Sequence, residues 1–228
     1  AGSYSVEGAG ECTQCPAGHA CPEPTAAQVD PCASGSYAVG GQAECTVCPA
    51  GSACPDPESA TVVPCDAGWY SLGGAVSCTA CPAGYACAST SSDVAVACTA
   101  GYYSTGHQAI CSPCPEGYFC ATTTSAPVAC PAGSYSVEGS TACQLCSPGQ
   151  YSVGGTRDCV VCPAGKYCPL TDTAQEVACE VGTYSVGGQD ACTPCPAGKR
   201  CSASGITEDC EAGSYSVEGA GECTQCPA

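Results

Sequence analysis

The sequence predicts a small disulfide-rich fold: a tandem array of short two-stranded β-ribbons and loops that forms an elongated rod with essentially no helix. Three observations predict it. Cysteine makes up 28 of the 228 residues, and a content above roughly 10% is typical of disulfide scaffolds or metal-binding chains. A cysteine motif recurs along nearly the whole chain. Large apolar side chains are scarce, with one Trp, one Phe and no Met.

The scarcity of large apolar residues rules out a sizeable hydrophobic core. The 44% hydrophobic content owes much to Cys and Ala, and Leu and Ile are rare. A chain that cannot bury enough apolar surface needs covalent links or metal ions to hold its fold. No stretch shows a sustained helical apolar period, so we expect no helix of any length.

The charge balance narrows the range of partners. Only Arg157, Lys166, Lys199 and Arg200 are basic, against 21 acidic residues, which gives a net charge of −17. Nucleic acid is excluded as a partner because phosphate contacts need Lys and Arg, and an anionic membrane surface is disfavoured for the same reason. The acidity could attract Ca²⁺ or basic partners, or simply solvate the surface. No run of 18 apolar residues is present, so we expect no membrane insertion in this segment.

The repeat defines the organisation of the chain. Pairs of cysteines separated by two residues recur, mostly 33 residues apart, starting with Cys12/Cys15 and Cys45/Cys48. Most pairs are followed by a CPAGxxC segment, and a later cysteine opens a stretch with Gly-x-Tyr. The predicted division is a partial repeat at 1–12, repeats at 13–45, 46–78, 79–111 and 112–143, a short repeat at 144–159, repeats at 160–192 and 193–223, and a partial repeat at 224–228.

A second, longer period is also present. Residues 1–17, AGSYSVEGAGECTQCPA, are identical to residues 212–228, which defines a higher-order period of 211 residues. Neighbouring repeats agree at only some positions, so identity over all seventeen positions indicates a longer polypeptide or polymer that repeats this block. We therefore expect the sequence to be an excised or mature segment, whose partner is further copies of itself. A recent local duplication is the alternative.

The short repeat suggests how the cysteines pair. Cys146 is followed directly by SPGQYSVGG, so it opens a tyrosine-containing loop as Cys32 and Cys65 do elsewhere. One rule then covers both loop types: each cysteine that opens a CxxG segment pairs with the next cysteine. The long loops under this rule are Cys32–Cys45, Cys65–Cys78, Cys98–Cys111, Cys130–Cys143, Cys146–Cys159, Cys179–Cys192 and Cys210–Cys223. The short loops are Cys15–Cys21, Cys48–Cys54, Cys81–Cys87, Cys114–Cys120, Cys162–Cys168 and Cys195–Cys201. Cys12 and Cys226 are left unpaired at the cut ends.

Other pairings were weighed against this rule. An interleaved scheme leaves Cys143 and Cys146 without partners in the short repeat. A scheme that closes every CxxC pair accommodates all 28 cysteines and stays open, although CxxC disulfides are usually redox-active rather than inert. Sequence alone does not fix the connectivity.

The segment CxxGxYS…C followed by CxxCPAG resembles the ephrin-receptor-like cysteine-rich repeats. It is also similar to the final loop of EGF-like modules and to the first loop of tumour-necrosis-factor-receptor modules. In those two families the equivalent long loop is closed by a disulfide between consecutive cysteines, which supports Cys32–Cys45 and its counterparts. The resemblance implies an extracellular rod of small modules. It brings no enzymatic residues and no ligand-binding residues to this chain.

Local signals predict the details of each repeat. Glycine two residues before each tyrosine suits a turn with positive φ, and pairs such as Gly73-Gly74 suit a two-residue hairpin turn. The tyrosine ring is expected to lie over the disulfide of its loop or over the neighbouring module, as a miniature core. The linkers, rich in Pro, Ser and Thr, favour extended or polyproline-like conformations. The cluster Thr122, Thr123, Thr124 and Ser125 is the best candidate for O-glycosylation, whereas N-glycosylation is impossible because the sequence has no Asn.

Catalytic and metal chemistry finds little support, and we expect neither an enzyme nor a cofactor. Zinc is the serious alternative to disulfides, but successive CxxC pairs are too far apart and the two His, His19 and His107, occupy unmatched positions. Eight near-equivalent CxxC pairs argue against one privileged redox pair. Calcium is conceivable but matches no known loop pattern. The carboxylates considered for it are Glu7, Glu11, Glu138, Glu218 and Glu222.

Two functional hypotheses follow. The first is a structural repeat protein that builds an extracellular fibre, surface appendage or stalk, because uniform repetition suits filaments. The second is the ectodomain stalk of a receptor or adhesin that binds protein or glycan ligands. That protein would carry an exposed aromatic patch, for which the sequence offers only Gly68-Trp69-Tyr70 and Tyr118-Phe119.

Overall fold

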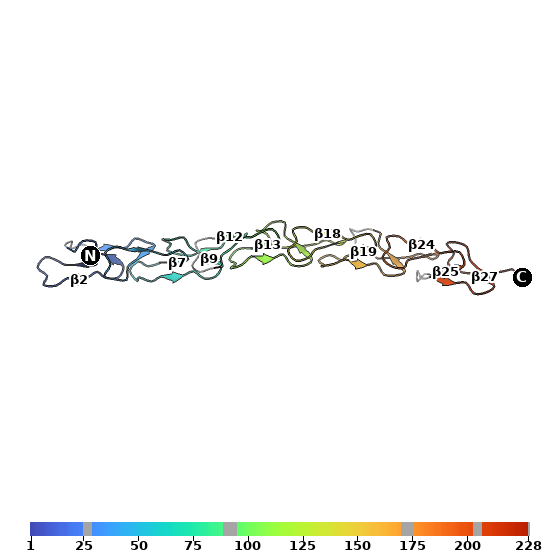
Figure 1. The fold of residues 1–228 in the computed structure, drawn as a ribbon, viewed down its shortest axis with the longest axis horizontal. Helices are drawn as coiled ribbons and strands as arrows, with labels where there is room; N and C mark the ends of the chain where they lie inside the picture. The colour runs from blue at the N-terminus through green and yellow to red at the C-terminus, as the bar shows by residue number, and fades with distance from the viewer. Residues whose placement is uncertain (25–28, 89–94, 170–175, 203–206, 228) are drawn as a thin grey trace. The chain divides into compact units, whose positions relative to one another are not determined.

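The computed structural model describes residues 1–24, 29–88, 95–169, 176–202 and 207–227. Within these residues the secondary structure consists of 28 short strands paired into fourteen two-stranded ribbons, and no helix is present (Figure 1). Each ribbon joins two strands that are consecutive in the chain. We number these hairpins 1 to 14 in chain order, so that hairpin 1 is β1–β2 and hairpin 14 is β27–β28. The predicted fold class, tandem disulfide-rich β-ribbons without helix, is confirmed.

Eight hairpins contain the Gly-x-Tyr segment, and we call them long-loop hairpins. Their strands are β1 Ser3–Tyr4 with β2 Thr13–Gln14, β5 Ser36–Tyr37 with β6 Thr46–Val47, β9 Trp69–Tyr70 with β10 Thr79–Ala80, β13 Tyr102–Tyr103 with β14 Ser112–Pro113, β17 Ser134–Tyr135 with β18 Gln144–Leu145, β19 Gln150–Tyr151 with β20 Val160–Val161, β23 Thr183–Tyr184 with β24 Thr193–Pro194, and β27 Ser214–Tyr215 with β28 Thr224–Gln225.

The other six hairpins begin in the CPxGxxC segment, and we call them short-loop hairpins. Their strands are β3 His19–Ala20 with β4 Asp30–Pro31, β7 Ser52–Ala53 with β8 Val63–Pro64, β11 Tyr85–Ala86 with β12 Val96–Ala97, β15 Tyr118–Phe119 with β16 Val128–Ala129, β21 Lys166–Tyr167 with β22 Val177–Ala178, and β25 Lys199–Cys201 with β26 Thr207–Asp209.

Both kinds of hairpin open with the same turn, which explains the CxxG motif. In hairpin 3 the Ser36 N–H donates to the Ala33 carbonyl (3.0 Å), and Gly35 lies at the third position of this turn with φ of 80°. In the short-loop hairpin 4 the Ser52 N–H donates to the Pro49 carbonyl (3.2 Å), and the φ of Gly51 is 76°. A type II turn requires positive φ at its third position, where only glycine fits without strain. The predicted positive φ before the tyrosines is confirmed.

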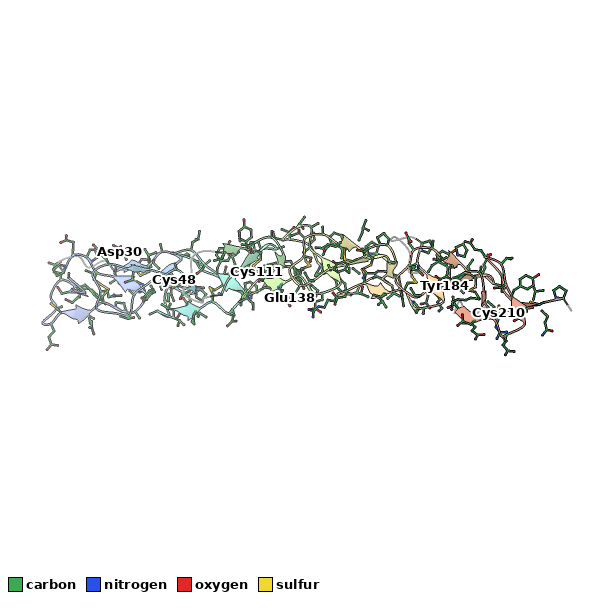
Figure 2. The ribbon with its side chains drawn as sticks, turned by 45° about the vertical axis from the view of Figure 1, so that its right-hand side comes forward. Asp30, Cys48, Cys111, Glu138, Tyr184 and Cys210 are labelled. Carbon is green, nitrogen blue, oxygen red and sulfur yellow. A yellow bond between two sulfur atoms is a disulfide. The ribbon has the colours of Figure 1, made fainter. Side chains whose placement is uncertain are left out.

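The interior is built from disulfides instead of aliphatic side chains. The structure holds thirteen disulfides, and each one joins the cysteine that opens a CxxG segment to the next cysteine in the chain, with sequence separations of 13 in the long loops and 6 in the short loops. The buried apolar residues are cysteines together with four alanines. Figure 2 shows the disulfides as yellow bonds along the ribbon, while acidic side chains such as Asp30 and Glu138 are exposed.

The chain forms two compact units. One consists of Ala1–Ser112 and Thr122–Ala126, and the other of Pro113–Ala121 and Pro127–Ala228. Inside each unit, recurring hydrogen bonds join most hairpins to the next one in the chain, and alternate hairpins also lie close together. This arrangement is that of a repeat protein, in which each module packs on its sequence neighbours.

Two local expectations differ from the structure. The Gly73-Gly74 pair does not form a two-residue hairpin turn, because Tyr70 pairs with Thr79 and the loop between them is longer. The tyrosine rings do not form a buried core, because no tyrosine is buried in the described residues. The described ends of the linkers pair as the second strands of the short-loop hairpins, as Val63 does opposite Ala53, and this pairing was not predicted.

Candidate functional site

The most regular feature of the structure is the contact between successive hairpins. The N–H of the glycine in one CxxG segment donates to the carbonyl three residues beyond the corresponding glycine of the next hairpin. This bond runs from Gly18 to Ala38 (2.8 Å) between a short-loop and a long-loop hairpin, and from Gly2 to Cys21 (3.0 Å) between a long-loop and a short-loop hairpin. The glycines that donate this hydrogen bond are Gly2, Gly18, Gly51, Gly68, Gly84, Gly117, Gly133, Gly165, Gly182 and Gly198. One backbone geometry therefore serves for both kinds of neighbour.

Two further hydrogen bonds close the contact where a long-loop hairpin follows. The tip of the long loop donates back to the opening cysteine of the preceding hairpin, as Gly41 N–H does to the Cys15 carbonyl (2.8 Å). The next carbonyl in the loop, that of Gln42, accepts from Cys21 N–H (3.0 Å). Each of the seven such contacts has this set of three bonds, with Ser136 N–H replacing a cysteine N–H between hairpins 9 and 10. These bonds fold the long loop onto its neighbour, which is why the Gly-Gly pair does not form a free hairpin turn.

Serine supplies the polar part of this interface. The serine after the tyrosine is buried in most long-loop hairpins, and its hydroxyl donates to a carbonyl of the preceding hairpin: Ser71 to Ser52 (2.7 Å) and Ser136 to Tyr118 (2.7 Å). In hairpin 3 the same position is Ala38, which is fully buried. A buried hydroxyl needs a partner, and here the backbone supplies it. These serines were not predicted from the sequence, although their recurrence after tyrosine, in the YS dipeptides, is a signal for them.

Alternate hairpins approach each other even more closely. A Cβ at Gly35 would overlap the carbonyl of Gly74, two hairpins further along the chain, and a Cβ at Gly149 would overlap the carbonyl of Gly188. Glycine is therefore needed at these turn positions for two reasons: the backbone has a positive φ, and the backbone of another hairpin lies where a side chain would be. The repeat of glycine at this position sets the spacing between hairpins.

The four basic residues are all used in ion pairs. Lys199 with Asp209 (2.6 Å) and Arg200 with Glu208 (2.7 Å) lie directly opposite each other on β25 and β26. Lys166 pairs with Glu176 in hairpin 11. Arg157 contacts Glu116 at 3.2 Å and joins hairpin 10 to hairpin 8. Three of these pairs each lie within one hairpin and the fourth joins two hairpins, so the cations do not form a basic patch. Their partners are exposed or half-buried side chains, where an ion pair contributes little.

The candidate modification site lies on the surface. Thr122, Thr124 and Ser125 are exposed and Thr123 is half-buried. The Thr122 hydroxyl donates to the Ser125 hydroxyl (2.9 Å) and lies 3.3 Å from that of Thr124. Access for a glycan at this cluster is thus open, and O-glycosylation stays a prediction.

The acidic side chains considered for calcium are spread over the surface. All five are exposed: Glu7, Glu11, Glu138, Glu218 and Glu222. Among the described residues, no three His, Cys, Asp or Glu side chains are close enough to hold a metal ion. The Nδ1 atom of His19 lies 3.1 Å from the Ala17 carbonyl oxygen. The His107 ring packs on Trp69, with the ring centroids 5.2 Å apart.

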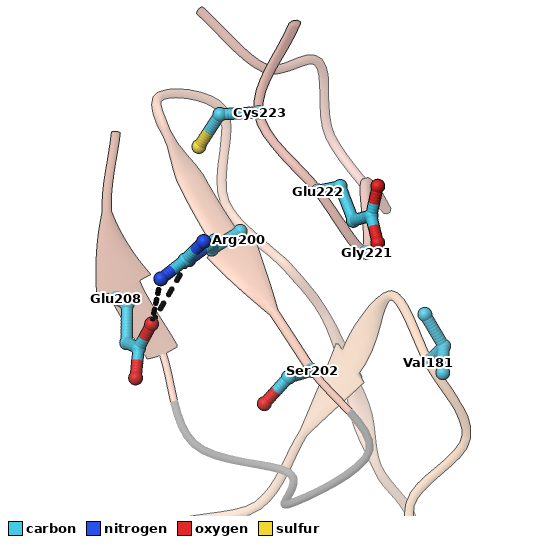
Figure 3. Close-up of a pocket in the computed structure, with 7 residues that line it drawn as sticks. All are labelled: Val181, Arg200, Ser202, Glu208, Gly221, Glu222 and Cys223. Carbon is cyan, nitrogen blue, oxygen red and sulfur yellow. Dashed lines mark hydrogen bonds and ion pairs between the residues drawn. The ribbon is translucent and has the colours of Figure 1, made fainter. Parts of the chain in front are cut away.

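An exposed depression of about 650 Å³ lies between hairpins 12, 13 and 14 (Figure 3). Arg200 and Glu208 form its central ion pair, and Glu222 and Val181 lie on the other side. The guanidinium is already engaged by a carboxylate, so its charge is compensated. The depression is a gap beside neighbouring hairpins, lined mostly by polar groups and backbone.

A row of aromatic residues was only partly recognised from the sequence. The position after the CxxG glycine holds Trp69, Tyr85 and Tyr102 in three successive hairpins, with exposed fractions of 38%, 40% and 43%. Tyr118 occupies the same position in the second unit and is 38% exposed. Elsewhere this position carries Ser, His, Gln, Lys or Thr. Aligning all hairpins on CxxG, instead of on the longer repeat, would have revealed the whole set.

Two cysteines remain outside the disulfide framework. Cys12 and Cys226 are both free and exposed. Each belongs to one of the two identical segments, 1–17 and 212–228. In the described part of the chain, no helix is long and apolar enough to cross a membrane.

The chain matches no family model, and the search of curated proteins finds no relative. The likeness to ephrin-receptor-like repeats therefore stays a resemblance in the motif. What the structure does establish is a cysteine-rich repeat protein made of disulfide-closed tandem hairpins.

Proposed function

We propose that this chain is a structural segment of an extracellular fibre, surface appendage or stalk, and that it is not an enzyme. The observation that carries the proposal is the recurrence of one three-bond contact at each of the seven places where a long-loop hairpin follows another hairpin. Modules that pack only on hairpins one or two places away in the chain add length with each copy, which is what a fibre or spacer requires. The exact 211-residue recurrence supports the same function.

The location outside the cell is supported by the covalent framework. Thirteen disulfides of local span suit an oxidising compartment, since cytosolic thiols are kept reduced. The acidic surface, with four cations all in ion pairs, keeps copies soluble and offers no anion-binding patch.

The proposal is tested by negative-stain electron microscopy of the native material. We expect long uniform filaments or stalks that soften or fall apart after reduction. Discrete short rods in the untreated sample would overturn the fibre proposal.

A second function, a receptor or adhesin stalk that binds a protein or glycan ligand, is favoured by one observation. Trp69, Tyr85 and Tyr102 expose aromatic rings at equivalent positions of successive hairpins, where Ser is common in the rest of the chain. Exposed aromatic side chains gathered in one region are typical of binding surfaces.

This alternative is tested by screening the chain and its Trp69→Ser variant on an array of glycans. Loss of a bound glycan in that variant, with binding kept in the control variant Leu72→Ser, would support the adhesin function. Leu72 is a suitable control because its side chain is 62% exposed in the same hairpin. An array without any bound glycan would remove the glycan-binding form of this alternative.

A further inference from the structure

One sequence appears twice in this chain with different neighbours. Residues 1–17 and 212–228 are identical, and both form a long-loop hairpin, hairpin 1 with Ser3–Tyr4 opposite Thr13–Gln14 and hairpin 14 with Ser214–Tyr215 opposite Thr224–Gln225. Hairpin 1 contacts hairpins 2 and 3, which follow it. Hairpin 14 contacts hairpins 12 and 13, which precede it. Hairpin 1 therefore shows this module with the face toward the following hairpins covered, and hairpin 14 shows it with the face toward the preceding hairpins covered.

Hairpin 1 shows what covers the face that looks toward the following hairpins. Its Gly2 is buried, donates its N–H to the Cys21 carbonyl (3.0 Å), and leaves no space for a Cβ against the Gly41 carbonyl. Cys15 is 2% exposed, is bonded to Cys21, and accepts the N–H of Gly41 at 2.8 Å. The Gln14 side chain packs against Gly41.

In hairpin 14 the same face is uncovered. Gly213, the counterpart of Gly2, is exposed, and a Cβ built on it would have no neighbour within 4 Å among the described residues. The Tyr215 ring is 49% exposed. Cys226, the counterpart of Cys15, is exposed and free.

The face that looks toward the preceding hairpins is covered in hairpin 14 and uncovered in hairpin 1. In hairpin 14, Ser216 is 8% exposed and its hydroxyl donates to the Lys199 carbonyl (2.6 Å), while Cys223 is bonded to Cys210. In hairpin 1 the counterpart of Cys223 is Cys12, which is free and exposed. Each bare face thus has its covered equivalent elsewhere in the same chain.

We propose that the uncovered face of hairpin 14, formed by Gly213, Gln225 and Cys226, is the docking surface for a second copy of hairpins 2 and 3, residues 18–48. This inference rests on the proposed function and specifies how one 211-residue period meets the next. The Gly213 N–H donates to the carbonyl of the second copy's counterpart of Cys21. The Cys226 carbonyl accepts the N–H of the counterpart of Gly41. The occupant is a second copy because an identical sequence already binds those hairpins in this way at hairpin 1.

A disulfide completes the junction. Cys226 pairs with the second copy's counterpart of Cys21: the two thiols lose two protons and two electrons and form one S–S bond, and a disulfide oxidant such as oxidised glutathione is reduced to two thiols. The cysteine count agrees with this pairing. The repeated segment carries two of the 28 cysteines, so one 211-residue period holds 26, which thirteen disulfides use completely.

The junction is therefore the same contact that joins hairpins within a unit. A Cβ at Gly213 would then meet the carbonyl of the counterpart of Gly41, as a Cβ at Gly2 would meet Gly41 itself. Copies joined in this way need no separate linker between periods.

The test compares the single chain with a two-period chain, residues 1–228 followed by a second copy of residues 18–228. In the two-period chain we expect disulfide mapping by mass spectrometry to find Cys226 bonded to the counterpart of Cys21. Thiol titration should find two free thiols, one at the first Cys12 and one at the last counterpart of Cys226. The Gly213 amide should exchange with deuterium at least about tenfold more slowly than in the single chain, since it gains an acceptor.

The Gly213→Ala variant is the matched control in both chains. In the single chain it should leave the exchange of neighbouring hairpins unchanged, whereas in the two-period chain it should remove the protection at the junction. A free Cys226, or one bonded to another cysteine, together with unchanged Gly213 exchange would overturn the inference. This outcome is distinct from failure of the fibre proposal, which depends on the form of the native material.

Discussion

At the residue scale, glycine and serine determine how closely the hairpins pack. The turn glycines combine a φ near 80° with a carbonyl of another hairpin at the place of the missing side chain, as at Gly35. The serine after the tyrosine fills the buried position between hairpins and donates its hydroxyl to the backbone. Small residues are therefore the specific residues of this fold, in place of the large apolar side chains of an ordinary core.

Replacing Gly35 by Ala tests the close approach. Gly35→Ala must both strain φ and displace the Gly74 carbonyl, whereas Gly139→Ala only strains φ, because no atom of the described residues lies within 4 Å of the new methyl group. We expect the control to lose about 1 kcal/mol and Gly35→Ala clearly more. Denaturant unfolding with intact disulfides measures both, and equal losses would contradict the account of the spacing.

The buried serine hydroxyl is tested at position 136. Ser136→Ala removes one hydrogen bond to the Tyr118 carbonyl and should cost about 1 kcal/mol, since alanine already fits the equivalent position at Ala38. Ser136→Val should cost more, because the added methyl groups overpack the interface. Thermal unfolding of the two variants gives the order of their stabilities. A valine variant as stable as the alanine variant would argue against tight packing at this interface.

The sequence predicted the glycines better than the serines. Positive φ has a strong local signature, glycine two residues before tyrosine, and the structure confirms it. The burial of Ser71 and the partial exposure of Tyr70 depend on which face of the ribbon the preceding hairpin covers. That choice is a tertiary effect, and local propensity does not report it.

At the element scale, every hairpin except hairpin 1 carries one disulfide that closes a small loop. The chain-entropy model assigns about 3 kcal/mol to closing a long loop and about 2 kcal/mol to closing a short one. Such contributions replace the hydrophobic burial that these residues lack. Because the closures are local, the loss of one should be felt locally.

Removing a disulfide tests this locality. The double variant of Cys65 and Cys78 to Ser should raise hydrogen exchange in hairpin 5 and its direct neighbours, and leave hairpin 1 unchanged. The double variant of Cys48 and Cys54 serves as the short-loop control and should have the smaller effect. A uniform rise in exchange over the whole chain would show that the hairpins unfold together instead.

The cross-strand ion pairs should matter little. Arg200 and Glu208 are 51% and 54% exposed, so Arg200→Ala is expected to cost less than about 1 kcal/mol. High salt should change the unfolding midpoint of the wild type and of this variant by similar small amounts. A large loss in Arg200→Ala would assign the pair a structural role that its exposure does not predict.

The long-loop ribbons were predictable, and the short-loop ribbons were not. A Gly-x-Tyr stretch flanked by cysteines indicates a ribbon by itself. In contrast, the ribbon of Ser52–Ala53 with Val63–Pro64 joins a CPAGxxC segment to the end of a variable linker. The longer repeat concealed this pairing, because it groups two different hairpins into one unit.

At the scale of the whole molecule, repetition replaces a common core. In each unit the same backbone bonds recur from hairpin to hairpin, and the composition alone predicted that no single hydrophobic core could form. The fold class was therefore predictable from cysteine content and period. The rod itself, its assembly and its setting outside the cell are properties of the proposed function.

Small-angle X-ray scattering from chains of one, two and three 211-residue periods tests the central claim most directly. If each period adds hairpins that pack only on hairpins one or two places away in the chain, the maximum dimension should increase by an equal step with each period while the cross-sectional radius stays constant. A maximum dimension that grows much less than in proportion, with a widening cross-section, would show that the periods fold back on one another and would contradict the structural role.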